Sequence, residues 1–247
     1  MYDFSFYLAL EIVLLTLFVV LVERKFLSYA QRRMGPVLMG RNGMFQILFD
    51  LVKLVTKEIF LIPRPSSLLA PIFLSLLFAF QLSFSQHFIL GPNLLIFSSL
   101  DSLILLHLIL ILFSNIFFCL TGFLSQSRYA IMGTVRGLVH IISLDIFITI
   151  IYSILSISSQ SVNFNDYVLM QNSYFFIILF SQITFCFVVL LILESKRTPF
   201  DHAETESEVV SGYSVEYSGP MLMMFYLAEY LHLVIASVHF NLFFMGG

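Results

Sequence analysis

Residues 100–124, LDSLILLHLILILFSNIFFCLTGFL, decide the fold, because a run this apolar is long enough to cross a bilayer as a helix. Five further runs have the same character, at residues 4–22, 67–86, 133–157, 173–193 and 220–245. None of them shows the alternation of barrel strands, and helices satisfy their own backbone groups in lipid. The sequence therefore predicts an all-α membrane protein with six transmembrane helices.

The composition excludes several classes of protein. Of the 247 residues, 59% are hydrophobic and 11% are charged, whereas a soluble domain has about 25% charged residues. A soluble enzyme and a disordered chain are both excluded. The net charge of −3 offers no basic surface, so we expect no nucleic-acid partner. The two cysteines lie in apolar runs, and no group of side chains has the spacing of metal ligands, so we expect no metal.

The basic residues predict the orientation. All twelve lie in or beside the polar segments that follow the first, third and fifth runs, and the other two connecting segments have none. Positive charge marks the side from which helices insert, so these segments should share the cytoplasmic or matrix face. The residues are Arg24, Lys25, Arg32, Arg33, Arg41, Lys53, Lys57, Arg64, Arg128, Arg136, Lys196 and Arg197.

The long segment after the first run contains an amphipathic pattern at residues 43–59. Polar residues share one helical face and apolar residues fill the other, so we expect one interfacial helix between the first two spans. The polar face holds Gln46, Asp50, Lys53 and Lys57, and the apolar side holds Phe45, Leu48, Val52 and Val55.

The acidic loop at residues 194–219 contains a cluster of five carboxylates, and no lysine lies among the last four of them: Glu194, Asp201, Glu204, Glu206 and Glu208. Carboxylates packed together raise one another's proton affinity, so this acidic loop could exchange protons near neutral pH. A solvated acidic loop is the alternative interpretation.

Ionisable residues also occur inside the apolar runs, where a charge is costly and indicates function. For His107 and His239 we favour an interhelical hydrogen bond, an interpretation that suits the carboxylates Asp145 and Glu229 less well. The set is Glu11, His107, His140, Asp145, Glu229, His232 and His239. A basic strip, Arg24, Lys25, Arg32 and Arg33, either determines topology or lines a mouth for an amphipathic ligand.

Several motifs, in this order, resemble subunit 1 of NADH:quinone oxidoreductase, respiratory complex I. They are ERKFLSYAQRRMGP at 23–36, TKE at 56–58, YAIMG at 129–133 with Arg136, RTPFD at 197–201, VSG at 210–212, VEY at 215–217 and AEY at 228–230. The resemblance covers nearly the whole chain.

The resemblance implies a subunit that admits ubiquinone from the bilayer, with ubiquinone as substrate and no permanently bound cofactor. FMN and the iron–sulfur clusters would lie on other subunits. The quinone chamber would contain Arg24, Arg33 and Arg197. The carboxylate path that couples quinone reduction to proton translocation would contain Asp50, Asp145, Glu194, Glu204, Glu206, Glu208 and Glu229. The family usually has Glu where this chain has Asp145, so the partner of this shorter carboxylate must lie nearer or be reached through water.

The same resemblance implies partners and a location. We expect contacts with membrane lipids and with the membrane-arm and peripheral-arm subunits of complex I, in the mitochondrial inner membrane with the basic loops in the matrix. A bacterial plasma membrane is the alternative. The family has eight spans, so a separate polypeptide is expected to supply two more helices. A proton-coupled transporter, a structural scaffold and a subunit of a membrane-bound hydrogenase or formate-linked complex are the alternative functions.

Overall fold

The computed structural model describes residues 2–58, 69–89, 103–172, 174–197, 200–201 and 212–246. Throughout these residues the regular structure is helical, without a β-strand. Three helices, Ile104–Leu124, Arg128–Ser159 and Pro220–Met245, are long and apolar enough to cross a membrane. The prediction of an all-α membrane protein is therefore confirmed, while the number of spans stays a prediction.

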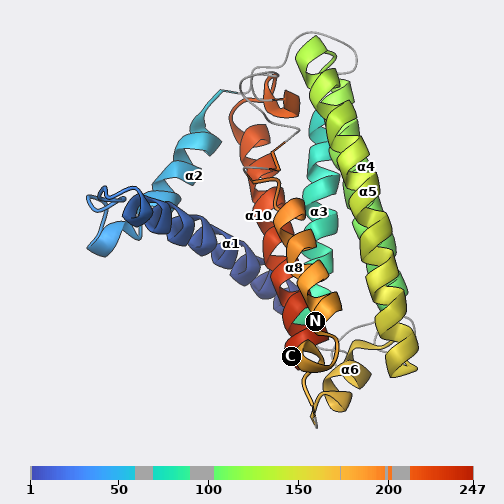
Figure 1. The fold of residues 1–247 in the computed structure, drawn as a ribbon. Helices are drawn as coiled ribbons and strands as arrows, with labels where there is room; N and C mark the ends of the chain where they lie inside the picture. The colour runs from blue at the N-terminus through green and yellow to red at the C-terminus, as the bar shows by residue number, and fades with distance from the viewer. Residues whose placement is uncertain are drawn as a thin grey trace.

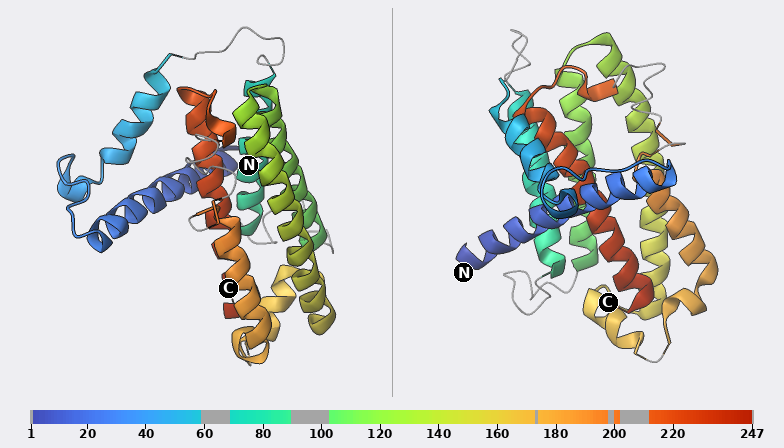
Figure 2. Two further views of the ribbon diagram at one scale, coloured as in Figure 1. Left: turned by 45° about the horizontal axis from the view of Figure 1, so that its top comes forward. Right: turned by 90° about the vertical axis from the view of Figure 1, so that its left-hand side faces the viewer.

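Five helices form an upright bundle (Figures 1 and 2). They are α3 (Ala70–Ile89), α4 (Leu103–Leu124), α5 (Arg128–Ser159), α8 (Ser181–Glu194) and α10 (Pro220–Phe240). Helix α1 (Tyr2–Ala30) crosses this bundle at a steep angle, and α2 (Gln46–Thr56) returns from its far end towards α10. The C-terminus lies at the lower end of the bundle in Figure 1, close to α6 (Phe164–Met170), whereas the N-terminal end of α1 projects away from the bundle in the right-hand view of Figure 2.

Several helix ends follow from local sequence signals. The Ser127 hydroxyl caps α5 by accepting a hydrogen bond from the Ala130 amide at 3.2 Å. The same helix ends at Gln160, whose φ of 53° is left-handed. Pro220 begins α10, where its missing N–H costs nothing. Helix α1 continues to Ala30, so the Glu23-Arg24-Lys25 motif is helical rather than part of a loop.

The run at residues 173–193 is not one straight helix. Helix α7 (Phe176–Leu179) ends at Phe180, whose φ of −115° and ψ of 48° are not helical, and α8 begins at Ser181. The polar segment before this run holds α6, which the sequence analysis treated only as a connection. The Gln171 side chain ties this region to the end of α10, because its amide nitrogen Nε2 donates to the Leu242 carbonyl oxygen at 3.0 Å.

Two apolar clusters hold the bundle together. One contains Phe118, Tyr213 and Phe225, and the other contains Tyr152 and Phe243. In a membrane such clusters stabilise a bundle by close packing, and small residues let helices approach. The buried Gly122 of α4 is one such residue, since a Cβ there would overlap the Thr134 side chain of α5.

Helix α2 is amphipathic in the structure. Its buried Ile47 packs with Leu17 and Leu21 of α1 and with Leu227 of α10. Much of its apolar side is exposed: Phe45, Leu48, Phe49, Val52 and Val55. The helix is shorter than the predicted 43–59, because a 3-10 turn, Arg41–Gly43, precedes it and Lys57 is extended.

We expect Gly219→Ala to weaken the contact between α2 and α10. Gly219 has a φ of 59° and a ψ of −131°, which only glycine adopts readily. A Cβ would also lie 2.9 Å from the Lys57 carbonyl oxygen. The expected cost is about 1–3 kcal/mol, measured as a lower thermal midpoint of the assembled protein. Gly246→Ala is the control, because Gly246 also has a positive φ but its Cβ would make only an ordinary 3.4 Å contact. Equal effects of the two changes would contradict the role given to the Lys57 carbonyl.

Candidate functional site

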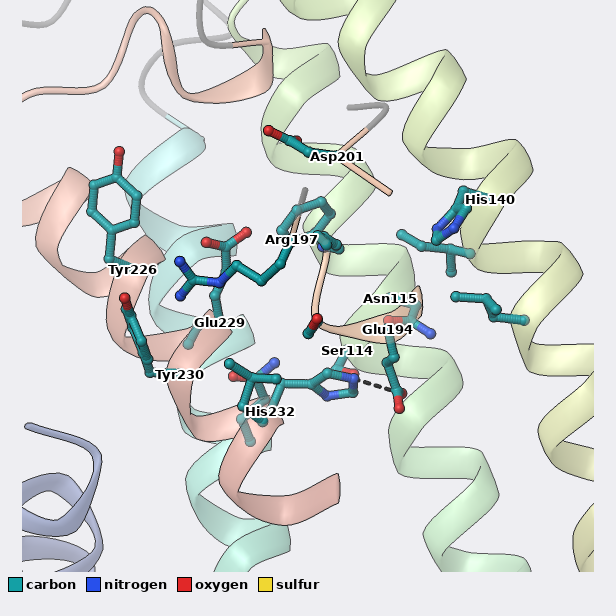
Figure 3. A pocket seen from close by; sticks show the side chains of 18 of the residues that line it. Ser114, Asn115, His140, Glu194, Arg197, Asp201, Tyr226, Glu229, Tyr230 and His232 are labelled. Atoms are coloured by element: carbon teal, nitrogen blue, oxygen red, sulfur yellow. Dashed lines mark hydrogen bonds and ion pairs between the residues drawn. The ribbon is translucent and has the colours of Figure 1, made fainter. Parts of the chain in front are cut away.

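A cavity of about 270 Å³ lies between α3, α4, α5, α10 and the end of α8. Figure 3 shows its labelled polar side chains, four of which come from α10. The polar and charged lining consists of Gln81, Ser114, Asn115, His140, Asp145, Glu194, Ser195, Lys196, Arg197, Asp201, Tyr226, Glu229, Tyr230 and His232. Most of these residues lie inside or at the ends of apolar helices, so the cavity concentrates charge within the bundle.

Glu194 and His232 join α8 to α10 across the cavity. The distance between His232 Nε2 and Glu194 Oε1 is 2.7 Å, and the side chains are 19% and 15% exposed, respectively. Figure 3 marks this contact with a dashed line. A short contact between a shielded carboxylate and an imidazole can hold a proton on either group, since both are acid–base groups with two stable forms.

Asp145 of α5 pairs with Asn115 of α4. The Asn115 side-chain amide lies 3.0 Å from Asp145 Oδ1 and 3.2 Å from Oδ2. Both residues line the cavity. The sequence analysis required a nearby partner for this shorter carboxylate, and Asn115 occupies that place. A neutral donor stabilises the ionised carboxylate without supplying a counter-charge.

Glu229 of α10 is held by a buried tyrosine. The Tyr213 hydroxyl donates to Glu229 Oε1 at 2.9 Å. The Tyr213 ring contacts the Phe118 ring edge-on, with centroids 4.6 Å apart. The Lys196 ammonium lies 3.3 Å from the Phe118 ring centroid and 5.8 Å from that of Tyr213. A cation on an aromatic face is stabilised by the ring quadrupole, which keeps this positive charge beside the carboxylates.

Arg197 connects the cavity to α1. Its two terminal nitrogens lie 2.8 and 3.1 Å from the two Glu23 carboxylate oxygens, a bidentate pair. The Tyr230 hydroxyl donates to Glu23 Oε2 at 2.9 Å, and the guanidinium carbon lies 5.2 Å from the Tyr230 ring centroid. Burial by itself lowers the pKa of Arg197, but its interactions with Tyr230 and the charge of Glu23 raise that pKa above the usual value. The guanidinium is therefore a permanent positive charge.

A second ion pair joins α1 to α2. Arg24 Nη1 lies 2.5 Å from Asp50 Oδ2, and the Gln46 side-chain amide donates to the other Asp50 oxygen at 3.3 Å. The Arg24 and Asp50 side chains are 51% and 34% exposed. Solvent screens such a pair, so it contributes little to stability. Its effect is to place charge on the face between the two helices.

The structure brings together some of the predicted site residues and separates others. Asp145, Glu194, Glu229 and Arg197 line one cavity. Arg24 and Asp50 form their own pair, and Arg33 is exposed in the turn after α1. Glu204, Glu206 and Glu208 lie outside the described residues. Metal-ligating side chains in the described ranges form no group of three or more.

The sequence analysis missed four partners: Glu23, Asn115, Tyr213 and Tyr230. Three of them belong to segments that were quoted only as motifs or lie beside them, and Asn115 is one neutral polar residue in an apolar run. An amide at membrane depth is costly unless it is hydrogen-bonded, and this was the signal available for Asn115. The contacts of Glu23 span 174 and 207 residues, which no local spacing predicts.

Replacing Asn115 with Leu is expected to lower any turnover that depends on Asp145. A hydrogen bond to a charged group contributes about 1.5–3 kcal/mol, and about 1.36 kcal/mol corresponds to about tenfold in rate. We expect a decrease of about tenfold for Asn115→Leu, measured as the turnover of the assembled protein. In an Asp145→Asn background the same change should have little further effect. Additive effects of the two changes would contradict a shared role.

Known proteins resemble this chain over nearly its whole length. The family model described as NADH dehydrogenase matches residues 4–247. The NADH-ubiquinone oxidoreductase chain 1 of Paramecium tetraurelia is 34% identical over 99% of this chain and 93% of its own length. The corresponding chain of Metridium senile is 35% identical over 93% of this chain and 69% of its own.

A bacterial protein matches as well. An NADH-quinone oxidoreductase subunit of Anaplasma marginale is 31% identical over 93% of this chain and 69% of its own length. The family match includes every residue that lines the cavity, since it omits only the first few residues of this chain. The chain therefore belongs to the NADH dehydrogenase family, whose members include these mitochondrial and bacterial oxidoreductase subunits.

Proposed function

We propose that this chain is the membrane subunit of NADH:ubiquinone oxidoreductase that forms the quinone entry chamber and begins the carboxylate path to proton translocation. The names of the relatives supply the reaction and its substrate, ubiquinone. The observation that carries the proposal is the gathering of Asp145, Glu194 and Glu229 with Arg197 around one cavity inside an apolar bundle. A lipid-embedded scaffold has no need of such a set, because each carboxylate at membrane depth is costly.

The proton-accepting groups of the proposed path lie around one cavity. Glu194 with His232, Asp145 with Asn115 and Glu229 with Tyr213 are three pairs on the walls of one space. Water in a polar cavity of this volume can carry protons between such pairs. Asp50, Glu204, Glu206 and Glu208 extend the path in our proposal, on the basis of the resemblance alone.

The quinone chamber is proposed on the side of the cavity where α1 and α2 lie. Arg197 lines the cavity and holds Glu23 of α1, and Arg24 one position later holds Asp50 of α2. The Arg197–Glu23 pair therefore links the cavity to α1, and the Arg24–Asp50 pair links α1 to α2. Reduction of a quinone beside them adds negative charge and takes up protons, and the charge acts on Arg197 and on the carboxylates behind it.

Tyr217 ties the segment before α10 to α4. Burial raises the pKa of Tyr217, whose hydroxyl donates to the Thr121 carbonyl oxygen of α4. The phenol therefore stays protonated over the working pH range and pins residues 212–217 to the bundle. The response of the acidic segment before Gly212 to the quinone is proposed on the basis of the resemblance alone.

The proposed setting is the mitochondrial inner membrane, with the basic segments on the matrix side. The exposed apolar side of α2 suits an interfacial helix in contact with lipid. Other membrane-arm and peripheral-arm subunits are the proposed partners, and they would carry FMN and the iron–sulfur clusters. The two further helices expected from the resemblance stay a prediction.

Arg33→Met tests the quinone chamber. Arg33 is exposed after α1, and a guanidinium there keeps a mouth hydrated and can bind carbonyl oxygens. In the assembled complex we expect slower ubiquinone reduction, by about tenfold, as for loss of one hydrogen bond from a charged group. NADH oxidation by a soluble acceptor should not change.

Arg128→Met is the matched control, because Arg128 is exposed at the start of α5 and lines no cavity in the described structure. If Arg33→Met lowers both activities equally, the residue supports assembly and not the quinone route. If neither activity changes, Arg33 has no part in the chamber.

A further inference from the structure

A second group of ionisable side chains is buried between α4, α5 and α10. His107, Tyr152 and His239 are 2%, 3% and 3% exposed. The Tyr152 hydroxyl and His107 Nε2 lie 3.4 Å apart. The two imidazole rings contact each other edge-on with centroids 4.0 Å apart, and Tyr152 and His239 have ring centroids 6.2 Å apart. We name these three residues the imidazole–phenol cluster.

The cluster lies deeper in the bundle than the large cavity. His239 follows His232 by seven residues on α10, which is about 10 Å along a helix. His107 precedes Asn115 by eight residues on α4, about 12 Å. Both displacements lead from the cavity towards the end of the bundle that holds α6 and the C-terminus (Figure 1). Two independent helices therefore place the cluster about two turns beyond the carboxylates.

A narrow space is lined by residues of both sites. This cavity of about 10 Å³ has Glu194 and His232, which also line the large cavity, and Tyr152 and His239 of the cluster in its walls. Apolar side chains from several helices, among them Ile148, Phe187 and Ile235, form its walls. This volume accommodates about one water molecule. Glu194 and His232 line this space and the large cavity as well, so they stand between the two.

Aromatic side chains close the far end of the cluster. The Phe243 ring centroid is 4.8 Å from that of Tyr152 and 6.2 Å from that of His239. Behind it, Tyr167 packs edge-on against Phe243 at 5.3 Å, and both residues are fully buried. In the described part of the chain the cluster is thus reached from Glu194 and His232, and the aromatic layer seals it from the end of the bundle.

We propose that the imidazole–phenol cluster is a proton-holding branch of the carboxylate cavity, filled and emptied through Glu194 and His232. The inference rests on the proposed function. The Glu194–His232 pair gives one proton to a water in the narrow space, and this water gives one to a ring nitrogen of His239. His239 then carries the added proton and the pair has one fewer, while the edge-on contact with His107 and the contact between His107 and the Tyr152 hydroxyl position the His239 ring.

Packing alone does not explain why three polar side chains occupy this part of the bundle. Three apolar side chains would fill the same space at less cost in lipid, where polar groups are expensive to bury. A sealed branch also holds a proton without opening a leak across the bundle. Return of the proton to Glu194 then depends on the charge of the cavity, which links the cluster to the state of the quinone.

Tyr152→Phe and His239→Leu test the branch in the assembled complex, reconstituted in sealed vesicles. Tyr152→Phe keeps the ring packing and removes only the hydroxyl, and His239→Leu removes the imidazole. We expect both to lose part of the proton yield per NADH oxidised, while the rate of ubiquinone reduction with an uncoupler stays normal. If His239→Leu does not assemble, Tyr152→Phe decides.

Tyr167→Phe is the matched control, because it removes a phenol hydroxyl at the same end of the bundle whose contact is the Ser161 carbonyl oxygen. A normal proton yield in Tyr152→Phe and in assembled His239→Leu overturns the branch and leaves interhelical packing as the role of the cluster. Glu194→Gln separates this failure from that of the proposed function. If Glu194→Gln lowers the proton yield and the cluster variants do not, only the branch is wrong. If Glu194→Gln is normal too, the carboxylate path is wrong.

Discussion

Glu194→Gln is expected to lower coupled ubiquinone reduction by about a hundredfold, the scale of a lost general acid–base group. Glu194 contacts His232 at 2.7 Å and both residues line both cavities, so a proton that passes between the cavities meets the Glu194–His232 pair. Glutamine keeps the shape and the acceptor oxygen but cannot take up or release a proton. The measurement is NADH oxidation with ubiquinone in the assembled complex, together with the proton yield per NADH.

Two further variants show whether the charge or the position of Glu194 matters. Glu11→Gln is the matched control, because it removes an exposed carboxylate from a membrane helix, α1. His232→Gln keeps Glu194 and replaces the titrating partner by a neutral donor, so an intermediate loss is expected. Normal turnover and a normal proton yield in Glu194→Gln would show that the Glu194–His232 pair is structural.

The sequence predicted the fold to the extent that apolar length determines it. The runs at 133–157 and 220–245 fall within α5 and α10 with its terminal turn, because a continuous apolar run has one stable form in lipid. Local turns were harder to predict. The break at Phe180 lies among apolar residues with no proline or glycine beside it. Helix α6 has seven residues and a mixed sequence, so its amphipathic signal is too short to stand out.

The site was predictable where a single residue carries the signal. Asp145 and Glu229 are carboxylates in apolar runs. A charge there is costly, so each residue can be recognised from the sequence as a candidate site residue. The hydrogen-bond partners were harder to predict, since Asn115 and Tyr213 are neutral, and the cost of burying a neutral polar group does not say which carboxylate it meets. Which neutral residue meets which carboxylate depends on how the helices cross, and only the assembled bundle determines that.

Glu23→Gln is the other change with a large expected effect, because one carboxylate there holds two side chains from distant segments. Both Glu23 oxygens accept from Arg197, at 2.8 and 3.1 Å, and Oε2 also accepts from the Tyr230 hydroxyl at 2.9 Å. Glutamine has one acceptor oxygen and presents an NH₂ group to a guanidinium that has only donors. The bidentate pair is lost, so Arg197 is no longer bound to α1 through Glu23.

The freed Arg197 remains a positive charge beside the cavity, where Glu229 is another acceptor on the same wall. We expect it to turn towards the carboxylates, which separates the cavity from α1 and lowers ubiquinone reduction by about tenfold or more. This effect corresponds to the loss of about 1.5–3 kcal/mol from hydrogen bonds to a charged group. NADH oxidation by a soluble acceptor should stay normal.

Two further variants, at Tyr230 and Glu58, are expected to lower ubiquinone reduction less than Glu23→Gln does. Tyr230→Phe removes one of the three hydrogen bonds to Glu23 and keeps the ring beneath the guanidinium, so a smaller loss than that of Glu23→Gln is expected. Glu58→Gln, at an exposed carboxylate after α2, is the control and should be neutral. If Glu23→Gln retains the full rate of ubiquinone reduction, the link between Arg197 and α1 has no part in the quinone route. If Tyr230→Phe is as damaging as Glu23→Gln, the phenol and not the bidentate pair positions the carboxylate.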